Sequence, residues 1–105
     1  MESLDAPALA ARLQAEPNLQ LVDVREPWEV DTAAIAGTHH IPLAELPQRA
    51  AELDPRRPTA VICHHGVRSA MAGQWLERAG FDEIINLSGG IDAWSQHVDA
   101  AVPRY

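Results

Sequence analysis

The only cysteine of the chain, Cys63, stands between two different kinds of sequence. The apolar run "TAVI" at 59–62 precedes it, and the polar stretch "HHGVRS" at 64–69 follows it. A cysteine attacks as its thiolate, and a thiol pKa falls from about 8.5 to roughly 3.5–7.5 at helix N-termini and beside cations. A strand that ends at Cys63 and a helix that begins shortly afterwards would aim free backbone N–H groups at the sulfur. This arrangement favours a nucleophile in an anion-binding loop. The alternative is a buried structural cysteine.

The residues after Cys63 supply the other parts of such a loop. Gly66 permits a tight backbone turn, so that several N–H groups can converge. Arg68 adds a permanent positive charge at the far side of the loop. Two interpretations stay open for the histidines: their side chains tune the thiolate or contact an acceptor, or they point into solvent and only their N–H groups matter. The candidate substrate-binding residues are His64, His65, Gly66, Val67, Arg68 and Ser69.

Alternating strands and helices are expected to position this loop. Short apolar runs predict strands, and 3.6-residue periodicity or capping residues predict helices. The predicted strands are 19–24, 37–43, 59–63 and 83–87, and the predicted helical segments are 3–16, 26–32, 43–53, 68–80 and 88–98. Alternation of this kind predicts an α/β fold, with a parallel sheet and helices on both faces, as one domain over 1–105. Sites in such folds lie beyond the carboxyl ends of the strands, where Cys63 falls.

Individual residues within these elements carry further expectations. Asp5 is placed to cap the first helix, ahead of Pro7. In the helix at 68–80, we expect one apolar face, and we expect Trp94 to be buried. The residues assigned to that face are Met71, Trp75, Leu76 and Ala79.

Charged residues also follow the strand at 19–24. We expect Asp23 to fix a loop by accepting backbone N–H bonds, and Arg25 to pair with a carboxylate, so both support the pocket. A smaller possibility is that Arg25 adds positive potential at the pocket mouth. A metal site could be imagined from His39, His40 and Cys63. Adjacent strand residues point to opposite faces, however, so the two histidines would not both bind one ion. We therefore expect no metal.

The composition restricts the function further. Net charge is −7, and the eight basic residues are all arginines, which is a poor basis for nucleic-acid binding. No apolar run approaches the ~20 residues that span a bilayer, and the start lacks a secretory signal, so we expect a cytoplasmic protein without membrane contact. A single cysteine excludes an internal disulfide. Any oxidised form of Cys63 must be resolved by a second molecule.

Four stretches, in this order along the chain, resemble the rhodanese-like sulfurtransferases, especially their small single-domain bacterial members. They are "LVDVREPWEV" at 21–30, "GTHHIPLAEL" at 37–46, "CHHGVRS" at 63–69 and "INLSGGIDAW" at 85–94. The resemblance implies a five-stranded parallel sheet wrapped by helices and chemistry that needs no cofactor. It implies that Cys63 accepts sulfane sulfur as a persulfide and passes it to a thiol or cyanide, and that Arg68 binds an oxyanion.

This sequence departs from the family pattern in two places. The family often shows Gly-His-Ile where the sequence has Ala33-Ala34-Ile35, so no role of that histidine transfers. The strand that usually precedes the first helix is nearly lost in "MESL" at 1–4.

The loop length separates sulfur chemistry from phosphate chemistry. Cys63 to Arg68 is C-x-x-x-x-R, whereas cysteine phosphatases have one residue more; the corresponding position here is Ser69. The expected function is therefore sulfur transfer from a small donor such as thiosulfate to cyanide or a thiol, protein thiols included. The alternatives are a sulfur-carrier or binding module without turnover and, less favoured, a phosphatase or arsenate reductase.

Overall fold

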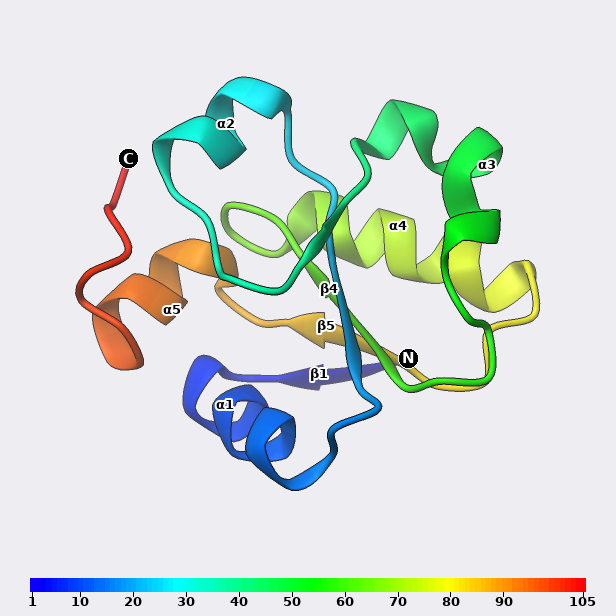
Figure 1. The fold of residues 1–105 in the computed structure, drawn as a ribbon, viewed down its shortest axis with the longest axis horizontal. Coiled ribbons are helices and arrows are strands. Elements are labelled where there is room, and N and C mark those ends of the chain that lie inside the picture. Colours follow the sequence, from blue (N-terminus) through cyan, green and yellow to red (C-terminus); the bar gives the residue numbers. More distant parts are fainter.

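A five-stranded parallel sheet forms the centre of the molecule. The computed structural model describes residues 1–105 and orders the strands β1-β5-β4-β2-β3, with every neighbouring pair parallel. Every residue of β2, β4 and β5 is buried, as expected where helices cover both faces of a sheet. The predicted α/β class is confirmed (Figure 1). The strands are β1 (Glu2–Leu4), β2 (Gln20–Asp23), β3 (His39–His40), β4 (Thr59–Ile62) and β5 (Ile84–Leu87).

Helices pack on both faces of this sheet and divide the core in two. Figure 1 shows α1 and α5 on one side and α3 and α4 on the other, with α2 beyond the end of β2. Alternate residues of the central strand serve opposite sides: Ala60 and Ile62 join one apolar cluster, whereas Val61 and Cys63 join the other. The helices are α1 (Ala6–Ala15), α2 (Pro27–Thr32), α3 (Leu46–Arg49), α4 (Val67–Arg78) and α5 (Gly90–His97).

The N-terminal segment begins with a short strand, although the sequence "MESL" predicts that this strand is nearly lost. β1 is three residues long and pairs with β5 along its whole length. Asp5 then caps α1, as predicted, by accepting a hydrogen bond of 2.9 Å from the Ala8 N–H. Arg12 forms ion pairs with Glu2 and with Glu83, so electrostatic contacts link α1 to the strand that precedes it and to the approach to β5.

Two helical predictions need correction. The segment 43–53 is three short helical pieces rather than one helix, with 3-10 turns at Leu43–Glu45 and Ala50–Glu52 on either side of α3. The buried face of α4 also differs from the prediction, which was correct for Leu76 alone. Met71 is 58% exposed, Ala79 is exposed, and Trp75 is half-buried. The face against the sheet consists of Ser69, Ala72, Gly73 and Leu76.

The reason for the second error is packing distance. Small side chains let α4 approach the sheet closely, and they leave the larger Met71 and Trp75 at the margin. Trp94 on α5 is buried, as predicted. None of the helices combines the length and the apolar character of a bilayer-spanning segment.

Candidate active site

The sulfur of Cys63 lies directly beyond the end of the central strand. The residue is 1% exposed. The Gly66 N–H donates a hydrogen bond to Sγ at 3.0 Å, and the Ser69 hydroxyl lies 3.3 Å from Sγ. Gly66 has φ +106°, in the left-handed region, and is the residue from which α4 starts. The loop therefore turns at Gly66 as predicted. It presents one N–H to the sulfur within hydrogen-bonding distance, that of Gly66, rather than several.

Asn86 on β5 holds this loop from the neighbouring strand. The Ser69 hydroxyl donates to Asn86 Oδ1, and Asn86 Nδ2 donates to the Gly66 carbonyl at 3.2 Å. A serine hydroxyl has one hydrogen. While that hydrogen faces Asn86, Ser69 can only accept from the Cys63 thiol; to donate to a thiolate it must turn away from Asn86.

The sequence analysis missed Asn86. An asparagine within the apolar strand "IINL" was the available signal, since asparagine is depleted in strands and needs partners when buried.

The N-terminus of α5 supports the loop from behind. The Ile91 N–H donates to the Cys63 carbonyl at 2.8 Å, and the Asp92 N–H donates to the His64 carbonyl at 3.2 Å. The first free N–H groups of α5 are thereby satisfied by the backbone of the cysteine loop itself. Gly90, the first residue of α5, lies directly against these two carbonyl groups.

Arg68 is held by a buried carboxylate. Its Nη1 and Nη2 donate to Glu29 Oε1 and Oε2 at 2.5 and 2.8 Å. The side chain of Arg68 is 34% exposed and that of Glu29 is 4% exposed. The Glu29 carboxylate also accepts from the Glu26 N–H at 3.0 Å and from the Tyr105 hydroxyl at 2.7 Å. The permanent charge expected at the loop is present, but it is paired.

Neither Glu29 nor Tyr105 was among the predicted site residues. Glu29 stands in the resembling stretch "LVDVREPWEV", but its partner Arg68 is 39 residues away. Tyr105 belongs to a tail that carries no motif. Figure 1 shows this tail rising from α5 toward α2, which brings the tyrosine to the site.

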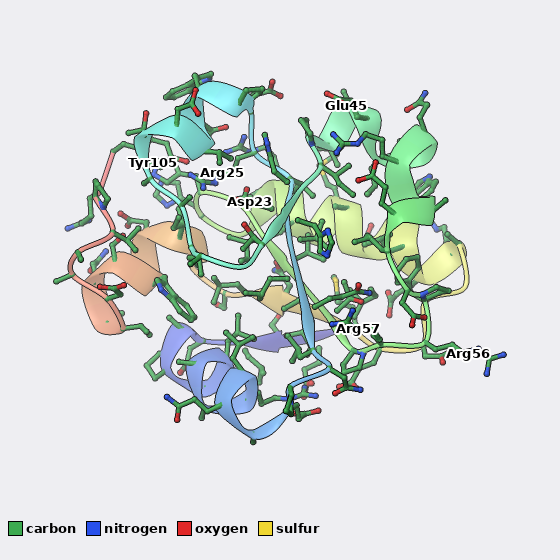
Figure 2. All side chains as sticks on the ribbon, viewed as in Figure 1. Asp23, Arg25, Glu45, Arg56, Arg57 and Tyr105 are labelled. Carbon is green, nitrogen blue, oxygen red and sulfur yellow. The ribbon has the colours of Figure 1, made fainter.

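Arg25 and Asp23 form a second, fully buried pair beside the first. Arg25 Nη2 lies 2.7 Å from Asp23 Oδ2, and Asp23 Oδ1 accepts from the Arg25 N–H at 3.1 Å. Both expected contacts are thus present. Arg25 also donates to the Tyr105 hydroxyl oxygen at 2.8 Å, and Figure 2 shows the three labelled side chains following one another from the tail to β2. Because Asp23 balances its charge, Arg25 adds little positive potential.

The two loop histidines have different surroundings. His65 is exposed, which matches the solvent interpretation. His64 is half-buried and stacks on Tyr105, with ring centroids 3.9 Å apart and planes 8° from parallel. Burial, with the nearby His65 as a second cause, lowers the pKa of His64 and so favours the neutral form of its ring. Its Nε2 is buried without a hydrogen-bond partner.

The remaining candidates lie at the margin. Val67 is 71% exposed and contributes its backbone as the first residue of α4. His40 Nε2 lies 2.7 Å from the Arg25 carbonyl, whereas His39 is exposed. The two histidines therefore have separate environments, as the alternation of a strand requires.

The pair between Glu29 and Arg68 predicts how stability depends on pH. The hydrogen bonds from Arg68 lower the pKa of Glu29 from 4.5 to about 2. A depressed carboxyl pKa stabilises the fold above the unfolded-state pKa, and this contribution disappears as the pH falls through the folded-state value. We expect a loss on the order of 3 kcal/mol between about pH 4.5 and pH 2 from this group.

Urea unfolding of the wild type and of Glu29→Gln at several pH values measures this loss. The difference in unfolding free energy between the two proteins should shrink as the pH falls below about 4.5. A difference that stays constant down to pH 2 would contradict the assignment.

Comparison with known proteins shows what the chain is similar to. The family model described as "Rhodanese-like domain" matches residues 6–97. A solved structure of a rhodanese-like domain protein from Staphylococcus aureus superimposes with a TM-score of 0.86 at 28% sequence identity, covering 100% of this chain and 99% of that one.

Two curated relatives carry names that refer to sulfur. A protein of Allochromatium vinosum named "Sulfurtransferase" is 32% identical over 92% of this chain and 91% of its own length. A protein of Bacillus subtilis named "Putative sulfur carrier protein YrkF" is 38% identical over 84% of this chain. The chain spans 48% of the length of this second relative.

Proposed function

The chain belongs to the family of rhodanese-like domains, and from this premise we propose that it transfers sulfane sulfur through a persulfide on Cys63. The observation that carries the proposal is the placement of a single buried thiol at the end of the central strand. Its sulfur faces the Gly66 N–H and the Ser69 hydroxyl. The Gly66 N–H can stabilise negative charge on either a thiolate or a persulfide, and the Ser69 hydroxyl can do so when its hydrogen turns away from Asn86.

The reaction has two displacement steps. The Cys63 thiolate attacks the outer sulfur of a donor, which is thiosulfate in the simplest case. The new S–S bond forms as the bond to the sulfonate sulfur breaks, and sulfite leaves with the bonding electron pair. The persulfide then gives its outer sulfur to an acceptor. With cyanide the products are thiocyanate and the Cys63 thiolate; with a thiol they are a new persulfide and Cys63. Neither step requires an external oxidant, an external reductant or a cofactor.

The surrounding residues have distinct roles in this proposal. Asn86 holds Ser69 and Gly66 in position, and α5 holds the carbonyl groups of Cys63 and His64. Arg68 supplies the guanidinium group next to the loop. The family resemblance implies that this group contacts the departing oxyanion, which is sulfite when thiosulfate is the donor. In the structure, the N–H groups of Arg68 already donate to Glu29, so an oxyanion has to compete with this carboxylate for them.

Mass spectrometry of the intact protein tests the proposal directly. After incubation with thiosulfate, the mass should increase by one sulfur atom, localised to Cys63, and cyanide should remove it with release of thiocyanate. A protein that stays unmodified in the presence of thiosulfate and of a small-molecule persulfide would refute sulfur transfer.

A carrier without turnover is the second candidate, and the name of the Bacillus subtilis relative favours considering it. A carrier would take up one sulfur atom per molecule and release it slowly to cyanide and small thiols. Repeated cycles with these acceptors distinguish an enzyme. Hydrolysis of an aryl phosphate at a comparable rate would instead revive the phosphatase alternative, which the six-residue loop disfavours.

A further inference from the structure

The cations beside the cysteine loop already have carboxylate partners, although an anion-binding site needs a cation that is free to contact the anion. Arg68 faces Glu29, and Arg25 faces Asp23, so these two guanidinium groups and two carboxylates carry no net charge. Among the neighbouring groups, Asp92 pairs with Arg104. Among these groups, Arg68 is therefore the cation that could stabilise negative charge at the sulfur, and it is already paired with the Glu29 carboxylate.

Arg68 belongs to the first turn of α4, directly before Ser69, whose hydroxyl lies 3.3 Å from the Cys63 sulfur. The hydrogen bonds of Glu29 are the main cause that raises the pKa of Arg68, and the charge of Cys63 is a smaller cause. The planar fork of Arg68 is engaged with the two carboxylate oxygens, in the bidentate geometry that arginine forms most favourably.

Glu29 is fixed in place by neighbours other than Arg68. The Glu26 N–H and the Tyr105 hydroxyl both donate to its carboxylate. Arg25 Nη1 donates to the Tyr105 hydroxyl oxygen, and the Tyr105 ring stacks on His64. An anionic donor that recruits Arg68 must therefore compete with a carboxylate that is 4% exposed and already oriented.

We propose that Glu29 determines donor specificity by withholding Arg68 from anionic donors, so that the site favours a persulfide, R–S–SH, over thiosulfate. This inference rests on the proposed function. With thiosulfate, the thiolate, the donor and the carboxylate place four negative charges together at the site, whereas a persulfide in its R–S–SH form adds no charge at the reacting sulfur and leaves two. The Cys63 thiolate attacks the outer sulfur of R–S–SH and forms Cys63–S–SH. The S–S bond of the donor breaks, and R–S⁻ leaves with the bonding pair.

The test compares Glu29→Gln with Asp31→Asn. Both substitutions remove one negative charge from α2, but Asp31 is exposed and outside the site. The measured quantity is the second-order rate constant for persulfidation of Cys63, from quenched mass spectrometry, with thiosulfate and with glutathione persulfide. We expect the wild type to react at least about tenfold faster with the persulfide, and Glu29→Gln to react about tenfold faster than wild type with thiosulfate. Its rate with glutathione persulfide should stay within about twofold, and Asp31→Asn should resemble wild type with both donors.

The double variant Glu29→Gln/Arg68→Met identifies the group that is released. The gain with thiosulfate should vanish in it, because the two effects are coupled through one contact. Should Glu29→Gln fail to fold, Tyr105→Phe removes one hydrogen bond from the carboxylate and should raise the thiosulfate rate by about twofold to threefold.

Several outcomes would overturn the inference. One is a wild type that reacts with thiosulfate as fast as with the persulfide. Another is a folded Glu29→Gln protein that reacts with thiosulfate no faster than wild type. Where Tyr105→Phe replaces Glu29→Gln, the same result in Tyr105→Phe would count equally. Persulfidation from glutathione persulfide in such a protein would leave the proposed function standing. A Cys63 that accepts sulfur from neither donor would overturn both.

Discussion

Cys63→Ser should lose sulfur transfer by at least about 10³-fold in kcat, because a hydroxyl neither ionises near neutral pH nor forms a persulfide. The chain has no second thiol that could substitute. The measurement is thiocyanate formed per unit time from thiosulfate and cyanide, or from glutathione persulfide and cyanide.

The fold of this variant should survive, which makes the result interpretable. Serine is slightly smaller than cysteine, and its hydroxyl can accept from the Gly66 N–H and interact with Ser69 in place of the sulfur. A thermal melt close to that of wild type is the control. A folded Cys63→Ser that still forms thiocyanate at the wild-type rate would place the nucleophile elsewhere and refute the mechanism.

Gly90→Ala should damage both stability and activity. A Cβ at this position would lie 2.3 Å from the His64 carbonyl oxygen and 2.5 Å from the Cys63 carbonyl oxygen. Both neighbours are backbone atoms that cannot rotate away. The backbone of Gly90 also has φ +61°, in the left-handed region. Strain and overpacking together should cost about 3 kcal/mol, and the midpoint of thermal unfolding should fall by about 10–20 °C.

The activity loss follows from the position of the clash. Relief requires the segment at Cys63 and His64 to move away from α5, which breaks the bonds from the Ile91 and Asp92 N–H groups. We expect kcat to fall at least about tenfold at a temperature where the variant is still folded, because displacements of about 1 Å at a reacting group are costly.

Gly37→Ala is the matched control for this prediction. Gly37 also has a positive φ, +81°, but a Cβ there would meet no atom within 4 Å. It should show the cost of backbone strain, about 1–2 kcal/mol, with kcat unchanged. Equal stability losses in the two variants, or a Gly90→Ala protein with wild-type kcat, would show that the close approach to the loop is unimportant.

The architecture and the position of the proposed nucleophile could be predicted from the sequence because they depend on short-range patterns. Continuous apolar runs separated by amphipathic segments predict a parallel sheet covered by helices, and a strand followed by a helix predicts where its loop must lie. The residues Cys63, Gly66 and Arg68 lie within six positions, so their spacing alone defines the loop. Asp23 and Arg25 are likewise close in the chain. The sequence predicted that Arg25 pairs with a carboxylate, and the structure identifies that carboxylate as Asp23.

Tertiary structure alone decided which charges meet and which atoms face the sulfur. Glu29 reaches Arg68 across 39 positions, and Tyr105 reaches Glu29 across 76. Neither separation is set by helix or strand periodicity. Asn86 faces Ser69 because β5 and β4 are neighbours in the sheet. The sequence determined that a thiol and a guanidinium share one loop. The fold determined that the guanidinium is neutralised, because the partner of a charge depends on distance in space rather than on position along the chain.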